Sequence, residues 1–245
     1  MRSSRLKYAF SLDAWNNLAK RTAHRTALRI RIVTGDILQS TLCGVEGLPK
    51  KIQSYMSDLS AQECKPPSIL SEPCSFGGEQ QRNRIRTVAE YCLSVYPGDI
   101  IEIGCYIGET TRILAEVAQA NGRRVVAVDP WETGTQNCSG VEYAQFQANI
   151  KQYADCVDVL RLSSLSPEAI QHVKQRKLAM AFVDGLHTYE AALSDIRTVS
   201  HCAGIIAVDD VSYSFDVMLA MRHAAHELGR KAVHLSPAKE GYLLP

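Results

Sequence analysis

The chain has 245 residues, of which 46% are hydrophobic and 22% charged, and its formal net charge at pH 7 is +1. This length suits one α/β domain with an extension, and the nearly balanced charge argues against bulk binding of nucleic acid. No apolar run approaches the roughly 18 residues of a membrane span, so we expect no membrane association. The eight cysteines lack C-x-x-C pairs and histidines at zinc spacing, which is typical of a cytoplasmic protein with reduced thiols.

The first 31 residues are strongly basic, with eight Lys or Arg against the single acid Asp13. They could bind an anionic surface or act as a targeting segment, but they lack the apolar centre of a secretory signal. A solvated helix that begins near Ser11 is the favoured interpretation. Turn-rich sequence at 65–68 and 71–73 then ends a region, 1–75, that we interpret as a helical and irregular cap or dimerisation extension. Residues 76–245 form the predicted main domain.

Strands and helices alternate along this domain. We expect strands at 100–104, 125–129, 157–162, 178–184 and 205–209, and helices at 79–95, 109–120, 141–153, from Ser166-Pro167 onward, at 188–200 and at 214–228. Such alternation predicts an α/β fold with a mostly parallel sheet and helices on both faces. Residues 231–235 and 241–244 surround Ser236-Pro237 and predict a terminal hairpin.

A glycine-flanked turn joins the first of these strands to the next helix. Gly104 and Gly108 would let the backbone pass close to a ligand, and Glu102 adds a carboxylate at the end of the strand. The G-x-x-x-G spacing differs from the G-x-G-x-x-G of dinucleotide dehydrogenases, which argues against NAD. Asp129 ends the next strand, where an acid can accept hydrogen bonds from ribose hydroxyls. The pattern therefore predicts a site for an adenosine-containing cofactor.

With these residues the chain resembles class I S-adenosylmethionine-dependent methyltransferases, and the segment from Glu102 to Gly108 looks especially like TylF/MycE-type sugar O-methyltransferases. The resemblance covers roughly residues 76–245 and implies a Rossmann-like, seven-stranded sheet. It implies cofactor contacts from Glu102, Gly104, Cys105, Tyr106, Gly108, Asp129, Pro130, Trp131, Ser163 and Asp184. Tyr106 stands where many members carry a glycine. Cys105 is a possible nucleophile, but small apolar packing is the favoured interpretation.

Three acids follow two later strands: Asp184 after one, and Asp209 and Asp210 after the other. The carboxyl ends of parallel strands meet at one edge, so these carboxylates should converge and require a counterion, most simply Mg²⁺. Asp209 and Asp210 could instead cap the next helix, although Ser212 or Ser214 can do so, and Asp184 could be a turn residue. The resemblance assigns all three to the metal site, with Mg²⁺ or Mn²⁺.

His187 follows Asp184 by three residues and fits a general base, as does Asp184 itself; relatives of the resembled family use one or the other. Leu186 departs from the aspartate usual in the family, which we expect to affect the choice of acceptor.

These features predict a Mg²⁺-dependent O-methyltransferase that acts on a hydroxyl of a sugar or natural-product diol and works as a homodimer. The alternatives are a catechol-type O-methyltransferase, a cephalosporin-hydroxylase-like relative, and a non-catalytic subunit that binds S-adenosylmethionine.

Overall fold

The computed structural model describes residues 78–132, 138–234 and 238–245. The predicted extension 1–75, its basic helix and the domain boundary lie outside these residues. The described elements are α3 (Glu79–Val95), β1 (Asp99–Ile103), α4 (Glu109–Ala120), β2 (Val125–Val128), α5 (Glu142–Ile150), η3 (Lys151–Cys156), β3 (Val157–Leu160), α6 (Pro167–Lys174), β4 (Leu178–Val183), α7 (Tyr189–Thr198), β5 (Ile206–Val208), α8 (Phe215–Leu228), β6 (Lys231–His234) and β7 (Gly241–Leu244).

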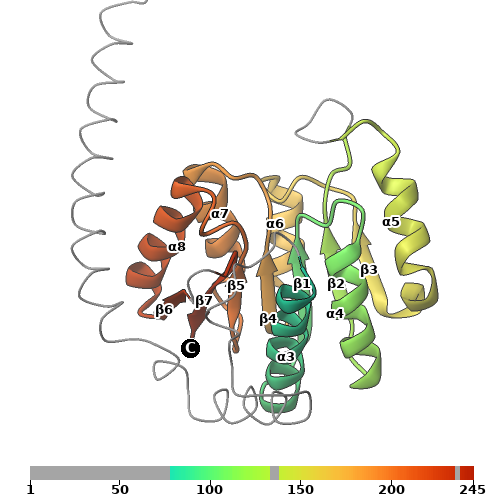
Figure 1. The fold of residues 1–245 in the computed structure, drawn as a ribbon, viewed down its shortest axis with the longest axis horizontal. Helices are drawn as coiled ribbons and strands as arrows, with labels where there is room; N and C mark the ends of the chain where they lie inside the picture. Colours follow the sequence, from blue (N-terminus) through green and yellow to red (C-terminus); the bar gives the residue numbers. More distant parts are fainter. Residues whose placement is uncertain (1–77, 133–137, 235–237) are drawn as a thin grey trace, which may run out of the picture. The chain divides into compact units, whose positions relative to one another are not determined.

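The strands form one seven-stranded sheet in the order β3-β2-β1-β4-β5-β7-β6 (Figure 1). Strands β1 to β5 pair in parallel, whereas β7 pairs antiparallel with both β5 and β6. The predicted parallel sheet with a terminal antiparallel hairpin is therefore confirmed. The chain leaves β1 for β2 on one side and β4 lies on the other, so the strand order reverses at β1. Ligands of open α/β sheets bind at such a reversal, beyond the carboxyl ends of the strands.

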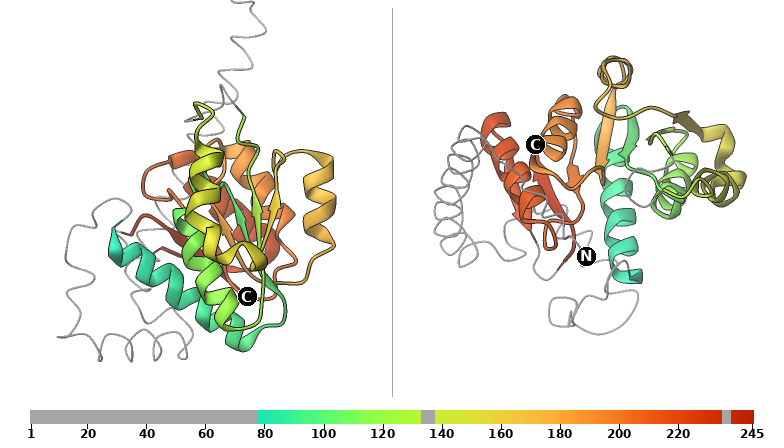
Figure 2. Two further views of the ribbon diagram at one scale, coloured as in Figure 1. Left: turned by 90° about the vertical axis from the view of Figure 1, so that its right-hand side faces the viewer. Right: turned by 90° about the horizontal axis from the view of Figure 1, so that it is seen from above.

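Helices cover both faces of the sheet, as Figure 2 shows from two further directions. Successive residues of β1 alternate between the layers: Ile100 packs in the core with α3, α4 and α5, whereas Ile101 and Ile103 pack in the core with α6, α7 and α8. Burial on both faces explains why the parallel strands are continuous apolar runs rather than alternating ones.

Local sequence signals account for several helix ends. Ser166, Thr188 and Ser214 each accept a hydrogen bond from the backbone N–H three residues later and so cap α6, α7 and α8. Gly229 ends α8 in the left-handed conformation at φ +64°. The helix predicted at 141–153 is wrong in its last turn, because α5 ends at Ile150 and the chain continues as the 3₁₀ helix η3. The change of hydrogen-bond pattern carries the chain directly into β3.

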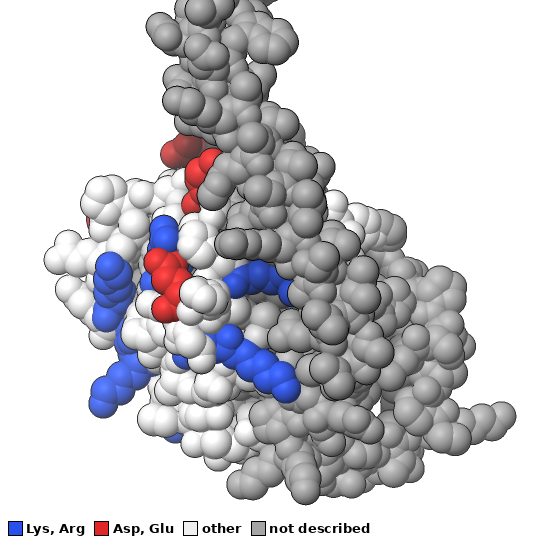
Figure 3. Space-filling model, turned by 90° about the vertical axis from the view of Figure 1, so that its left-hand side faces the viewer, with Lys and Arg blue, Asp and Glu red and all other residues white. Residues whose placement is uncertain are grey.

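Among the described residues, no helix is long and apolar enough to cross a membrane. Figure 3 shows one face on which Lys and Arg side chains lie separately among uncharged residues, with acidic side chains between them.

Candidate functional site: a glycine loop beside an acidic cluster

Asp129 organises the loop that joins β1 to α4. Its Oδ2 accepts hydrogen bonds from the backbone N–H groups of Cys105 (2.9 Å) and Tyr106 (3.0 Å), and its Oδ1 accepts one from Trp131 (2.8 Å). Trp131 Nε1 donates in turn to the carbonyl of Tyr106 (2.6 Å). The acid at the end of β2 therefore holds the predicted cofactor loop in place, and ribose hydroxyls would have to bind to the remaining lone pairs of the same carboxylate.

The glycines of this loop make room for the protein itself. A Cβ on Gly104 would lie 1.9 Å from the carbonyl oxygen of Asp184, and one on Gly108 would lie 2.7 Å from Cδ2 of Phe146. Both glycines have positive φ, as does Tyr106 at φ +47°. From the sequence, we expected these glycines to open space for a ligand. In the structure, the space that a Cβ would occupy is filled by Asp184 and Phe146 instead. Tyr106 adopts a backbone conformation that glycine favours, which fits the glycine seen there in the resembled family.

Gly104→Ala is expected to destabilise the fold by about 3 kcal/mol or more, because its Cβ would collide with rigid backbone and the residue would be held at positive φ. Gly122→Ala is the matched control: Gly122 has φ +63° but no atom within 4 Å of its Cβ position. The control should cost only about 1 to 2 kcal/mol. Urea denaturation measures both, and equal losses would contradict the packing argument.

Glu102 lies buried at the end of β1, on the face covered by α3 and α4. Its side chain is 1% exposed, and its Oε2 has no hydrogen-bond partner among the described residues. Burial raises the pKa of Glu102 to about 8. The Oε2 atom, which has no partner among the described residues, fits an acceptor for an N–H group of a ligand, such as the amino group of a methionine-containing cofactor.

Cys105 lies in the same loop, and its thiol points into the core rather than toward a substrate. It is 4% exposed, and burial raises its pKa well above the usual value. A thiol in this state is a poor nucleophile. The packing interpretation of Cys105 therefore agrees with its surroundings.

The remaining predicted cofactor residues occupy two places. Pro130 and Trp131 follow β2, and the buried Trp131 ring packs against Tyr143 and Phe146 at centroid distances of 5.0 and 4.6 Å. Ser163 is exposed in the turn between β3 and α6. The packed Trp131 ring thus stabilises the glycine loop, whereas the exposed Ser163 side chain is accessible to a ligand.

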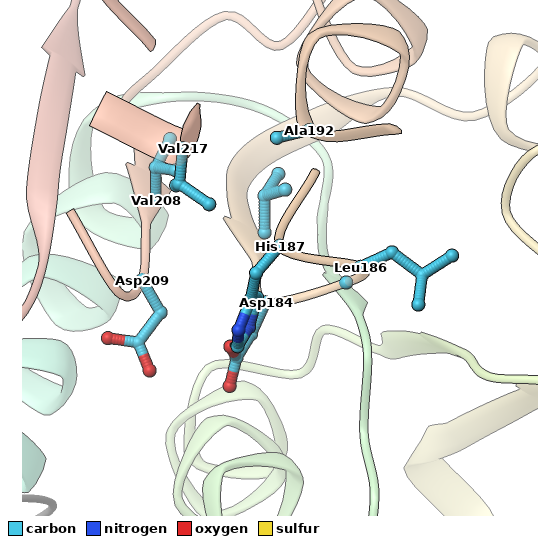
Figure 4. A pocket seen from close by; sticks show the side chains of 9 residues that line it. Asp184, Leu186, His187, Ala192, Val208, Asp209 and Val217 are labelled. Atoms are coloured by element: carbon cyan, nitrogen blue, oxygen red, sulfur yellow. The ribbon is translucent and has the colours of Figure 1, made fainter. Parts of the chain in front are cut away.

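Asp184, His187 and Asp210 come together at the carboxyl ends of β4 and β5. His187 Nε2 lies 2.8 Å from Asp210 Oδ2 and 3.5 Å from Asp184 Oδ1. Figure 4 shows the Asp184 and His187 side chains pointing the same way, while Leu186 points away from them. The backbone of Asp184 also lies beside the start of the glycine loop: its N–H donates to the carbonyl of Ile103 (2.7 Å), and its own carbonyl oxygen lies 1.9 Å from the Cβ position of Gly104. The acidic cluster and the predicted cofactor loop are therefore adjacent.

Asp209, the third predicted metal ligand, has other partners. Its Oδ1 accepts a hydrogen bond from Gln81 of α3 (2.8 Å), and its Oδ2 lies 2.7 Å from Lys239 Nζ. Lys239 also reaches Asp210 Oδ1 at 3.0 Å. Sequence reasoning did not identify Gln81 or Lys239. The position of Lys239 follows from the antiparallel pairing of β7 with β5, in which Ile206 faces Leu243 and Val208 faces Gly241. Continued by two residues, this register places Lys239 beside Asp210.

Charge interactions shift the titration of this cluster. Hydrogen bonds that the His187 ring donates to Asp184 and Asp210 raise the pKa of His187 to about 10. Burial, reinforced by the neighbouring Asp184, raises the pKa of Asp209 to about 7. The pKa of Asp210 is lowered although burial opposes the shift, because His187 and Lys239 hydrogen bond to it. Near neutral pH the described cluster therefore contains an imidazolium and an ammonium among its three carboxyl groups.

The donor atoms fit a divalent cation. Asp184, His187 and Asp210 each offer one ligand atom, and these atoms lie within 4.8 Å of one another. The repulsion argument for a metal is nevertheless weaker than the sequence suggested, because Lys239 and protonated His187 already face the carboxylates. Whether Asp209 is a metal ligand stays a prediction.

Comparison with known proteins gives a domain and a fold. No curated protein matches the sequence. Two solved structures of CalS11 are similar to this chain. The apo form, described as a TDP-rhamnose 3′-O-methyltransferase of calicheamicin biosynthesis, is 18% identical with TM-score 0.54 over 80% of this chain and 93% of that one. The second, described as calicheamicin methyltransferase, is 15% identical with TM-score 0.56 over 100% of this chain and 99% of that one. The O-methyltransferase TomG from Streptomyces achromogenes, involved in tomaymycin synthesis and solved with S-adenosylmethionine, is 15% identical with TM-score 0.50 over 78% and 94%.

At such identities these likenesses show the fold alone, and they confirm the predicted Rossmann-like methyltransferase architecture. The sequence match is independent of them: residues 101–211, from β1 to just beyond β5, match a family described as a methyltransferase domain. This segment contains the glycine loop, Asp129 and the acidic cluster. Over this segment the chain is similar to a methyltransferase domain, and the prediction that the protein is a methyltransferase enzyme is confirmed.

Proposed function

We propose that the protein is an S-adenosylmethionine-dependent O-methyltransferase that acts on a hydroxyl of a small molecule, a sugar or a natural-product diol. The observation that carries this proposal is the contact between the glycine loop and the acidic cluster through Gly104 and Asp184. It puts groups able to take up a proton next to the loop predicted to hold the cofactor. The printed descriptions of CalS11 and TomG as O-methyltransferases support the same activity.

O-methylation forms a bond between the acceptor oxygen and the methyl carbon, breaks the sulfur–methyl bond, and releases the hydroxyl proton. S-adenosylmethionine supplies an already electrophilic methyl group, so the chain's own residues need mainly to align the hydroxyl and accept its proton. His187 is protonated in the described arrangement, since its pKa is raised to about 10. Burial raises the pKa of Asp184, which makes it a stronger base than an ordinary aspartate. We therefore assign the proton to Asp184, with the imidazolium of His187 orienting its carboxylate.

The proposal includes a divalent cation, Mg²⁺ or Mn²⁺, at Asp184, Asp210 and the adjoining Asp209. Carboxylate oxygens are the ligands that Mg²⁺ prefers in proteins. When bound there, the cation would lower the pKa of the acceptor hydroxyl and fix its oxygen. The carboxylate oxygens of Asp184 and Asp210, which lie within 4.8 Å of each other, support this assignment.

Exposed apolar side chains support an acceptor with an apolar face. Tyr106, Val141, Leu165, Leu186 and Tyr213 are each at least 40% exposed, and each belongs to the loop that follows a different parallel strand. The carboxyl ends of parallel strands share one edge, so these loops lie around the candidate site. Two of the side chains are tyrosines, which also stack on aromatic rings. This observation favours a catechol-type acceptor as the second candidate.

We further propose, as the sequence suggests, that the enzyme belongs to the TylF/MycE-like subgroup and works as a cytoplasmic homodimer. In this proposal residues 1–75 act as the cap or dimerisation extension. Small molecules, rather than nucleic acid or membranes, are the proposed partners.

Metal-stripped protein incubated with methyl-labelled S-adenosylmethionine and a panel of sugar and catechol diols tests the activity. We expect a labelled methyl ether and S-adenosylhomocysteine only when Mg²⁺ or Mn²⁺ is added. Turnover of catechols alone would select the second candidate. Full activity in excess chelator would remove the metal from the proposal, and cofactor binding without turnover of any diol would favour a non-catalytic subunit.

A further inference from the structure

Lys239 lies inside the acidic cluster rather than at its rim. Its Nζ is 2.7 Å from Asp209 Oδ2 and 3.0 Å from Asp210 Oδ1, and its side chain is only 23% exposed. It comes from the segment before β7, far in sequence from the strands that supply the acids. The chain thus brings its own cation to the two carboxylates expected to hold a metal.

Neighbouring contacts hold Lys239 in this position. The carbonyl of Lys239 accepts a hydrogen bond from the backbone N–H of Ser212 (3.4 Å). The next residue, Glu240, is fully buried and pairs with Arg84 of α3 and with the hydroxyl of Tyr242. Lys239 is therefore placed by the strand register and by a buried ion pair, unlike a surface lysine that rotates freely.

N–H donors occupy the carboxylate oxygens that a cation would need. Asp209 Oδ1 accepts from Gln81 and its Oδ2 contacts Lys239; Asp210 Oδ1 contacts Lys239 and its Oδ2 contacts His187. Asp184 Oδ1, at 3.5 Å from His187, has the loosest contact of the group. A divalent cation that binds Asp209 or Asp210 must displace one of these donors or lie within a few ångströms of an ammonium group.

We propose that Lys239 is a built-in counterion that competes with the divalent cation for Asp209 and Asp210 and keeps the affinity for that cation weak. The inference rests on the metal part of the proposed function. Repulsion between an ammonium and a divalent ion at this separation is strong in a partly buried site. Ionisation of the bound acceptor hydroxyl adds negative charge and would offset this repulsion. The cation therefore binds tightly only together with the acceptor, which limits its binding to unproductive enzyme.

Calorimetric titration of the metal-stripped full chain with Mn²⁺, at one fixed pH, tests the proposal without any turnover. Lys239→Gln removes the charge but keeps an N–H donor, and we expect it to bind Mn²⁺ at least about tenfold more tightly than the wild type. Lys239→Arg keeps the charge and should stay as weak as the wild type. Lys174→Met, at an exposed position of α6, controls for net charge and should change nothing.

Equal or weaker Mn²⁺ binding by Lys239→Gln would overturn the proposal, and Lys239→Met makes the same comparison if the glutamine variant does not fold. If neither wild type nor variant binds Mn²⁺, both this inference and the metal part of the proposed function fail. Cofactor binding, measured with S-adenosylhomocysteine alone, is a separate readout and is unaffected by that result.

Discussion

Replacing Asp184 by Asn is expected to lower kcat by roughly 10²- to 10⁴-fold, which is the range for loss of a proton-transfer group. Asn has nearly the same shape as Asp, but it cannot take the hydroxyl proton and offers no charge to His187, 3.5 Å away. The loss should fall on kcat measured at saturating cofactor and acceptor. Steady-state kinetics on a purified acceptor, with the fold checked by thermal denaturation, gives the result.

The companion variant His187→Gln shows which group takes the proton. Gln keeps an N–H donor near Asp210, so a positioning role for His187 predicts a smaller loss than that of Asp184→Asn. A larger loss in His187→Gln would assign the proton to the imidazole instead. His201 is exposed just beyond the C-terminal end of α7, away from the candidate site. The control variant His201→Ala should therefore leave kcat unchanged. If Asp184→Asn keeps full activity, the proposed route for the proton is wrong.

Arg84→Met is expected to cost about 3 to 5 kcal/mol of unfolding free energy, because it leaves a buried charge without its partner. Arg84 and Glu240 have side chains 8% and 0% exposed, and they are joined by two hydrogen bonds, one of 3.2 Å from Nη2 to Oε2. The pair connects α3 to the segment before β7, where Glu240 follows Lys239, so its loss should also loosen the acidic cluster. Urea denaturation at constant pH measures the change.

Two comparisons make this test specific. Arg197→Met breaks the exposed pair with Glu227, and we expect a much smaller effect because water replaces the partner. The double variant with Arg84→Met and Glu240→Gln removes the stranded charge and should recover part of the loss. A loss below about 1 kcal/mol in Arg84→Met would contradict a structural role for the pair.

Element boundaries in the domain could be predicted to within one or two residues because their signals are local. Ser166-Pro167 marks the start of α6, Thr188 and Ser214 cap α7 and α8, and Gly229 ends α8. The strands after β1 were predicted slightly too long, since Asp129, Asp184 and Asp209 follow the last paired residues rather than belonging to the strands. The α5 boundary failed because nothing in residues 141–153 distinguishes an α-helical turn from a 3₁₀ turn.

The site was only partly predictable because some of its contacts depend on register and packing. Asp184 and Asp210 could be placed together from parallel strands alone, since such strands share a carboxyl edge. Lys239 could not, because its position follows from how β7 pairs with β5. Gln81 depends on how α3 packs beside the sheet. The acids seen in the sequence alone indicated a metal as their counterion. The structure adds the ammonium group of Lys239 to the same cluster, which neutralises part of that negative charge.

Binding of S-adenosylhomocysteine, measured by calorimetry, tests the central claim most directly. We predict that the wild type binds, that Asp129→Ala loses about tenfold or more in affinity, or roughly 1.5 to 3 kcal/mol, and that Asp129→Asn, which keeps an acceptor oxygen, lies between them. Asp155→Ala, at an exposed position of η3, should bind like the wild type. No binding by folded wild-type protein would contradict the cofactor assignment, and undiminished binding by Asp129→Ala would contradict the role given to Asp129.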